Sequence, residues 1–153
     1  MEQIKVNKKN KKGFTLIELL VVVSLLGVLA TLVIANLNSA RERARDATRK
    51  SDLRNIQTAL RLYYNDKGTY PQGSGGVMSA CDGVCTWGSA WVNNNVTYMG
   101  KLPADPLSGQ SYVYTGVSGG EDYYLKACLE NKSDDKGVAD SGCPSGYKYE
   151  VRP

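Results

Sequence analysis

The sequence contains no histidine. This absence excludes a Ser-His-Asp or Cys-His nucleophile pair and removes the side chain that most often exchanges protons near neutral pH. The sequence also lacks a glycine-rich phosphate-binding loop and a pair of carboxylates at catalytic spacing. We therefore predict that the chain is not an enzyme.

The chain also lacks an excess of either charge outside its first 13 residues. Its formal net charge is +4 over 153 residues, and residues 1–13 contain five lysines against one glutamate, which accounts for all of that excess. Direct binding of nucleic acid requires positive charge on the folded part of a protein. The sequence therefore predicts a basic leader, residues 1–13, and no direct nucleic-acid partner.

Charge is almost absent from the next segment, residues 14–37, FTLIELLVVVSLLGVLATLVIANL, in which Glu18 is the only charged side chain. As a helix this segment would be roughly 36 Å long, enough to cross a hydrocarbon core of about 30 Å. The preceding lysines predict that the leader is cytoplasmic and that the C-terminal domain lies outside.

Two alternative interpretations of this segment remain. A secretory signal peptide has the same basic-then-apolar order, but its apolar region is about 7 to 15 residues long and ends at a small-x-small cleavage site. The segment here is longer. A simple single-pass anchor fits the length, but it leaves the carboxylate of Glu18 unexplained.

The helical pattern continues through residues 38–65, which contain neither glycine nor proline. Apolar residues at spacings of three and four predict one buried face on this second, amphipathic half: Leu53, Ile56, Leu60, Tyr63 and Tyr64. Gly68 and Pro71 are typical of a helix end. We therefore expect one helix of about 50 residues, whose second half packs on the remaining domain.

The remaining domain, residues 66–153, begins with a Gly/Ser/Asn-rich stretch, residues 70–101, that predicts a loop with little regular structure. Three short runs rich in Tyr and Val follow at residues 111–115, 122–129 and 147–152. They predict an antiparallel sheet of three strands, or of four if Val96–Met99 joins it. The predicted fold is α+β, with a long N-terminal helix packed on this small sheet.

Four cysteines lie in this domain, and an even number in an exported domain favours disulfides. Three connectivities are open, and the pairs Cys81–Cys85 and Cys128–Cys143 are favoured because each closes a loop that is local in sequence. A four-cysteine zinc site is the alternative. Its usual paired C-x2-C motifs are missing from this sequence.

Residues 11–20, KKGFTLIELL, combine a basic segment, an unhindered glycine and a carboxylate that would lie within the membrane. A charge at that depth is costly without a partner. Cleavage after Gly13 would create an α-amino cation on Phe14, with which Glu18 of a neighbouring copy could pair. The alternative is that Glu18 reaches the membrane surface from near the helix end.

This stretch closely resembles the class III signal of type IV pilins and type II secretion pseudopilins. The shared features are a glycine before the cut, an aromatic new N-terminus and a glutamate at the fifth mature position: Gly13, Phe14 and Glu18. The resemblance implies that a prepilin peptidase cleaves between Gly13 and Phe14 and methylates the new amine. Gly27 also matches a frequent family glycine, whereas a proline often found a few residues later is missing.

The resemblance further implies the partners and the location of the chain. Subunits of this family assemble with one another and with minor pilins through the N-terminal helix, on a membrane platform protein driven by a cytoplasmic ATPase. The implied location is the cytoplasmic (inner) membrane, as a single-pass protein with its globular domain outside, and then an extracytoplasmic filament.

The resemblance also implies a calcium site in a late loop of the sheet, as in major pseudopilins. The comparable residues here are Glu130, Asp134, Asp135 and Asp140, which supply hard oxygen ligands without the spacing of an EF-hand. The alternative is a solvated acidic turn closed by Cys128 and Cys143. We expect no other cofactor.

The sequence thus predicts a structural subunit, a major pilin or pseudopilin, that polymerises into a type IV pilus or a type II secretion pseudopilus after cleavage at Gly13/Phe14. The alternative is a signal-anchored extracytoplasmic binding domain that forms no filament. In that case Trp87 and Trp91 would contact a ligand, whereas in the favoured interpretation they are local core.

Overall fold

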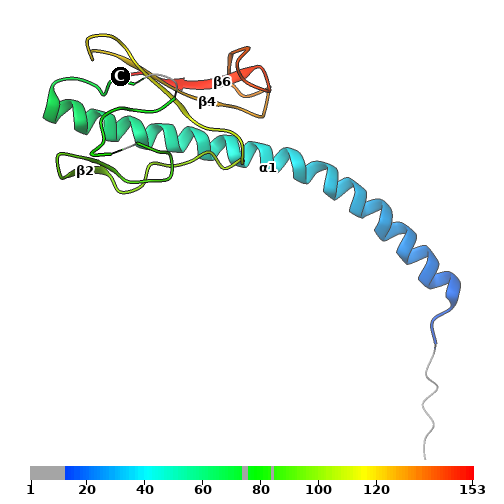
Figure 1. Cartoon of the computed structure of the whole chain (residues 1–153). Helices are drawn as coiled ribbons and strands as arrows, with labels where there is room; N and C mark the ends of the chain where they lie inside the picture. Colours follow the sequence, from blue (N-terminus) through cyan, green and yellow to red (C-terminus); the bar gives the residue numbers. More distant parts are fainter. Residues whose placement is uncertain (1–12, 74–75, 84) are drawn as a thin grey trace, which may run out of the picture. The chain divides into compact units, whose positions relative to one another are not determined.

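The computed structural model describes residues 13–73, 76–83 and 85–153 (Figure 1). The predicted leader lies outside the described residues except for Gly13. The structure confirms the α+β fold, with one long helix followed by short strands: α1 (Leu16–Lys67), β1 (Trp91–Asn93), β2 (Val96–Met99), β3 (Val113–Gly116), β4 (Tyr123–Cys128), β5 (Val138–Ala139) and β6 (Tyr147–Val151).

The chain divides into two compact units, Met1–Asn38 and Ser39–Pro153, and helix α1 contributes to both. We call residues 16–38 of the helix the apolar segment and residues 39–67 the domain segment. In the apolar segment the large aliphatic side chains are exposed, including Leu16, Leu32 and Ile34. By length and composition this helix can cross a membrane.

The domain segment buries the face that the sequence predicts. Leu53, Ile56 and Leu60 are fully buried, and Tyr63 packs at the edge of the same core. The helix ends at Lys67, two residues beyond the predicted end. Gly68 then adopts a positive φ of 73° and its N–H donates to the carbonyl of Tyr64 at 2.8 Å, which terminates the helix as a left-handed cap.

A four-stranded antiparallel sheet covers one side of the domain segment, in the order β3-β4-β6-β5. Strands β4 and β6 lie within two of the predicted runs, and β3 begins inside the run at residues 111–115 and ends one residue beyond it, at Gly116. Along β4, Tyr123, Leu125 and Ala127 alternate inward to the core while the residues between them are partly exposed, which is the pattern of a sheet with one covered face.

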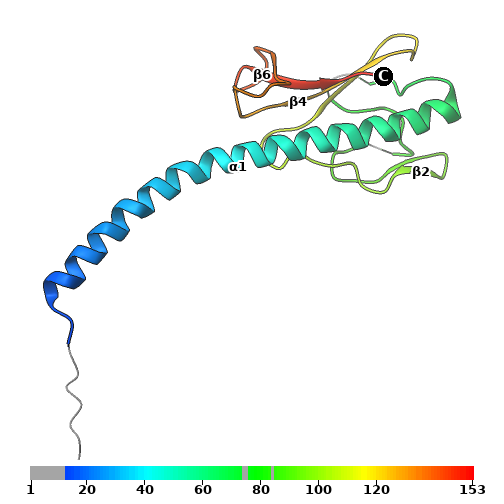
Figure 2. The same ribbon diagram turned by 180° about the vertical axis from the view of Figure 1, so that it is seen from behind.

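The fourth strand of this sheet is β5, and Val96–Met99, which the sequence left open as a fourth strand, does not join it. That segment, β2, pairs with β1 in a separate two-stranded sheet (Figure 2), on the opposite side of the domain segment from β4 and β6 in both views. Asn94 and Asn95 have positive φ and form the two-residue turn of a hairpin. Strand β1 lies next to β2 in the sequence, so the two can pair at a lower loop-closure cost than β2 and a distant strand. Residues 70–101, which the sequence analysis expected to form a loop, therefore contain this hairpin.

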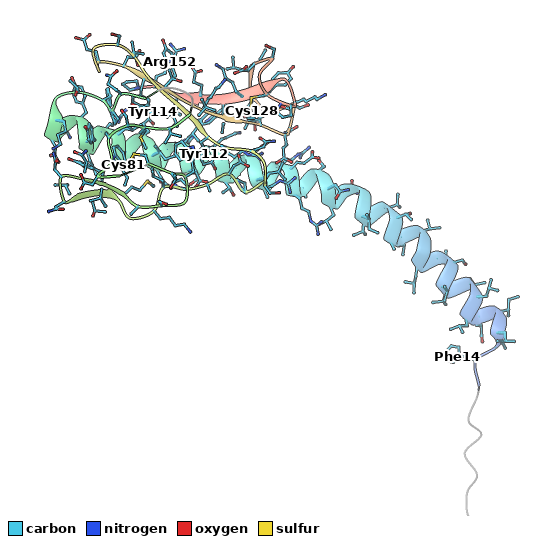
Figure 3. All side chains as sticks on the ribbon, in the orientation of Figure 1. Phe14, Cys81, Tyr112, Tyr114, Cys128 and Arg152 are labelled. Atoms are coloured by element: carbon cyan, nitrogen blue, oxygen red, sulfur yellow. A yellow bond between two sulfur atoms is a disulfide. The ribbon has the colours of Figure 1, made fainter. Side chains whose placement is uncertain are left out.

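Tyrosines fill the space between the helix and the four-stranded sheet (Figure 3). Tyr112, Tyr114 and Tyr123 are fully buried. The hydroxyl of Tyr112 donates to Asp52 of the helix at 2.6 Å, and that of Tyr114 donates to the carbonyl of Pro71 at 2.7 Å. These bonds let a polar group sit in the core without leaving it unpaired.

The outer edge of β3 is covered by residues 71–73 and Gly76. The N–H of Gly116 donates to the carbonyl of Gly73 at 2.9 Å. A Cβ on Gly116 would lie 2.6 Å from the carbonyl oxygen of Pro71, so only glycine permits this approach. The covering segment therefore continues the hydrogen bonding of the sheet beyond its edge strand.

Candidate processing and assembly site

The start of helix α1 brings Glu18 into contact with Thr15. The backbone N–H and the hydroxyl of Thr15 both donate to the same carboxylate oxygen of Glu18 at 2.8 Å, and the N–H of Glu18 faces the hydroxyl of Thr15 at 3.3 Å. This reciprocal arrangement is a capping box. Glu18 therefore has a partner within its own chain, which the sequence analysis missed although the spacing Thr-x-x-Glu was a signal for it.

Gly13 and Phe14 precede this capped helix start in non-helical backbone. The side chain of Phe14 is 92% exposed, and no described atom lies within 4 Å of the position that a Cβ on Gly13 would take. The peptide bond between the two residues is thus accessible within the described part of the chain.

The domain segment contains a second cluster of charges, centred on Arg49, whose side chain is 0% exposed. Two of its nitrogens bind the two carboxylate oxygens of Asp105, both at 2.8 Å. A third nitrogen donates to Asp46 at 2.7 Å and to Glu130 at 2.6 Å. The guanidinium therefore joins the helix to two segments that are far apart in the sequence.

The interactions in this cluster favour the ionised forms of Glu130 and Arg49. Hydrogen bonds from Arg45, and then from Arg49, outweigh burial and lower the pKa of Glu130 to about 2. Burial works against the charge on Arg49, but its carboxylate partners raise its pKa overall. The sequence analysis missed this cluster. The spacing from Asp46 to Arg49 was visible, but partners 56 and 81 residues away leave no local signal.

The four carboxylates of the predicted calcium site do not converge. Glu130 binds Arg45 and Arg49, Asp134 binds Lys50, and Asp140 binds Lys126 and Lys148, while Asp135 is exposed. Within residues 13–73, 76–83 and 85–153, no group of three His, Cys, Asp or Glu side chains is arranged to hold a metal ion.

All four cysteines form disulfides, Cys81 with Cys85 and Cys128 with Cys143, which are the two local pairs that the sequence favours over a zinc site. Trp91 is fully buried and its indole N–H donates to the carbonyl of Ala80 at 2.7 Å. Trp87 packs against Tyr112 with ring centroids 5.7 Å apart. Trp91 therefore belongs to the core, and Trp87 is partly buried and packs against it.

Two family profiles match the chain. Residues 8–34 match the prokaryotic N-terminal methylation motif, and residues 36–138 match protein G of the type II secretion system. The first match contains the capped helix start, and the second contains the domain segment and strands β3 and β4 of the sheet.

Curated relatives agree with these matches. The chain is 37% identical over 103 residues to type II secretion system core protein G of Escherichia coli, covering 67% of this chain and 70% of the relative. It is 33% identical over 118 residues to the Pseudomonas aeruginosa protein of the same name, covering 76% and 83%.

A pilus protein is also similar. The type IV wide pilus major component PilA4 of Thermus thermophilus is 37% identical over 71 residues, which cover 46% of this chain and 54% of that protein. No solved structure matches the chain significantly. With a methylation motif followed by a protein G region over most of its length, the chain belongs to the protein G family of type II secretion pseudopilins, relatives of the type IV pilins.

Proposed function

We propose that this pseudopilin polymerises through its N-terminal helix into the filament of a type II secretion system. The observation that carries the proposal is the exposed apolar segment, most of which lies within the methylation motif and in which no described large aliphatic side chain is buried. Such a helix needs lipid before assembly and other apolar helices after it. The protein G profile over residues 36–138 favours a pseudopilus over a pilus.

Processing would precede assembly. A prepilin peptidase would cleave the exposed bond between Gly13 and Phe14 and methylate the new amine of Phe14. The subunit would then rest in the inner membrane, with its leader side in the cytoplasm and residues 39–153 outside. A platform protein with its assembly ATPase would add it to the filament, next to minor pseudopilins.

Glu18 would exchange partners during assembly. In the single subunit its carboxylate accepts two hydrogen bonds from Thr15 and so is not an isolated charge. In the filament, Glu18 would pair with the methylated amine of Phe14 on a neighbouring subunit, and that pairing would fix the axial register. The exchange replaces neutral donors by a cation, which forms the stronger hydrogen bond in a dry environment.

The experiment compares Glu18→Ala with Ser24→Ala in cells that assemble the filament. Ser24 lies in the same helix, and its hydroxyl bonds only to backbone carbonyls of its own helix among the described residues. Glu18→Ala should be cleaved and inserted normally but should reduce filament yield at least tenfold, as measured by shearing and immunoblotting. Ser24→Ala should assemble like the wild type.

Intact-mass analysis of the membrane-purified protein tests the processing step by itself. A mature chain that begins with N-methyl-Phe14 supports the proposal. A chain that begins at Met1 or near residue 40 contradicts it and favours an anchored or secreted binding domain. Wild-type filament yield from Glu18→Ala would contradict the partner exchange alone.

A further inference from the structure

The loop that follows β4 is enclosed by the disulfide between Cys128 and Cys143, which are 15 residues apart with Cα atoms 5.3 Å apart. It contains the four carboxylates for which the family resemblance implies calcium. Calcium binds six to eight oxygens that converge at about 2.3 to 2.6 Å. Whether this loop suits the ion depends on what its carboxylate oxygens already contact.

Both oxygens of Glu130 are occupied by guanidinium groups. Arg45 donates to one oxygen from Nε at 2.7 Å and to the other from Nη2, and Arg49 donates to the first oxygen at 2.6 Å. A calcium ion bound to the Glu130 carboxylate would lie close to two guanidinium cations that are already hydrogen-bonded to the same carboxylate. The repulsion disfavours metal binding there.

Lysines occupy the other two partly buried carboxylates. The ammonium group of Lys50, on the helix, binds one oxygen of Asp134. Asp140 accepts from Lys126 at 2.9 Å, and Lys148 lies 3.6 Å away from the same oxygen. The remaining oxygens of Asp134 and Asp140 accept backbone N–H groups within the loop, from Lys136 and Gly142. A metal ion would therefore have to displace contacts that already neutralise these groups.

The ends of the loop are also fixed without a metal. The buried carboxylate of Asp46 accepts the backbone N–H groups of Glu130 and Asn131 at 2.8 to 3.1 Å. At the far end, the hydroxyl of Ser145 donates to the carbonyl of Leu129. The disulfide then holds the two ends together.

We infer that this loop is held by the chain's own arginines and lysines and by the Cys128–Cys143 disulfide in the place of a calcium ion, so that the folded subunit requires oxidation but not calcium. Folded relatives that depend on a bound ion lose stability when the ion is removed. This subunit should not. The inference concerns the single subunit and holds whether or not the subunit polymerises.

The first experiment compares the full-length protein in detergent with 2 mM calcium chloride and with 2 mM EDTA. The melting temperature, followed by tryptophan fluorescence, should be the same within about 1 °C. Hydrogen exchange of peptides from residues 129–142 should also be unchanged. A calcium-dependent rise of about 3 °C or more, or slower exchange of this loop with calcium, would overturn the inference.

The second experiment removes one of the cations. Arg45→Gln deletes the fork that holds Glu130, whereas Arg43→Gln removes an exposed arginine for which no ion pair is found among the described residues. In EDTA, Arg45→Gln should speed hydrogen exchange of residues 129–142 at least threefold, and Arg43→Gln should leave it unchanged. Equal exchange in the two variants would show that the cations do not hold the loop.

The third experiment separates the two disulfides. Cys128→Ser/Cys143→Ser should lower the melting temperature by more than about 5 °C and expose the loop to trypsin at Lys132 or Lys136. Cys81→Ser/Cys85→Ser should leave that loop resistant. A resistant loop in Cys128→Ser/Cys143→Ser would contradict the role of this disulfide. None of these measurements depends on filament yield. A result that contradicts this inference is therefore distinguishable from one that contradicts the proposed polymerisation.

Discussion

The two segments of helix α1 present similar aliphatic residues to different surroundings. In the apolar segment, Ile34 is 61% exposed, whereas in the domain segment Ile56 is 0% exposed and belongs to the hydrophobic core. The domain segment also contains charged residues that form salt bridges, such as Arg49 with Asp105. The apolar segment contains one charged residue, Glu18, which caps its own helix.

This difference teaches that the two segments of one continuous helix can contribute to different properties, the first to membrane insertion or assembly and the second to the stability of the folded domain. The domain segment contributes to unfolding of the subunit, because its partners belong to the same unit of the chain. The apolar segment has no described tertiary partner, so its substitutions should affect membrane insertion or assembly instead. Both tryptophans, Trp87 and Trp91, lie in the domain, and their fluorescence reports the stability of the domain alone.

Among substitutions that test this comparison, Arg49→Met is expected to change the free energy of unfolding the most. The substitution leaves Asp46, Asp105 and Glu130 without their shared cation in a buried site, which typically costs about 3 to 5 kcal/mol. Urea unfolding followed by tryptophan fluorescence measures the loss. Arg54→Met, at an exposed position of the same segment, is the control, and an equal loss in both variants would contradict the central role of Arg49.

A matched pair of isoleucines tests the comparison directly. Ile56→Ala should reduce the free energy of unfolding by about 2 to 5 kcal/mol, because it opens a cavity in the core. Ile34→Ala should change it by less than about 0.5 kcal/mol. The same urea titration in detergent measures both. If Ile34→Ala proved as costly as Ile56→Ala, the two segments would share one cooperative unit.

Acid should weaken the domain through Glu130. Its pKa is lowered from 4.5 to about 2 in the folded protein by its hydrogen bonds to Arg45 and Arg49. The stabilisation is therefore fully present above about pH 4.5 and is lost as the pH falls toward 2. Glu130→Gln should remove roughly 1 to 3 kcal/mol of that pH dependence, measured by urea unfolding at several pH values.

Other carboxylates with lowered pKa values, including Asp134 and Asp140, will leave part of the acid dependence in that variant. Glu18→Gln is the control from the apolar segment. Its acid-unfolding profile by tryptophan fluorescence should match that of the wild type. A changed profile would show that the helix start contributes to the stability of the domain.

The smallest effect is expected from exposed alanines. Ala47→Gly, in the domain segment, should lower the free energy of unfolding by about 1 kcal/mol through helix propensity alone. Ala30→Gly, in the apolar segment, should leave the unfolding of the domain unchanged. Circular dichroism and tryptophan fluorescence on the same samples separate loss of helix from loss of the domain.

Local patterns predicted much of the fold. The spacing of Leu53, Ile56 and Leu60 predicted the buried helix face, and the three Tyr- and Val-rich runs located β3, β4 and β6 to within one residue. Two strands were missed because β5 has only two residues and β1 lies in a stretch rich in Gly, Ser and Asn. Neither is long enough to show an alternating pattern.

The sequence predicted the processing motif at the helix start but not the charged cluster around Arg49. The residues Gly13, Phe14 and Glu18 follow from a contiguous motif, and the first family profile covers the same residues. The contact of Arg49 with Asp105 and Glu130 was not predictable, because it depends on how distant loops return to the helix. The calcium expectation took the acidic loop by itself and missed the lysines that other elements bring to it.

The covered edge of β3 bears on how such subunits behave when crowded. Unpaired strand edges are where sheets of different molecules join and aggregate. Here the hydrogen bond from Gly116 to Gly73 closes one edge of the four-stranded sheet, and the strand at the other edge, β5, has only two residues. Domains of neighbouring molecules that come close together would therefore have little opportunity to pair edge to edge into one sheet.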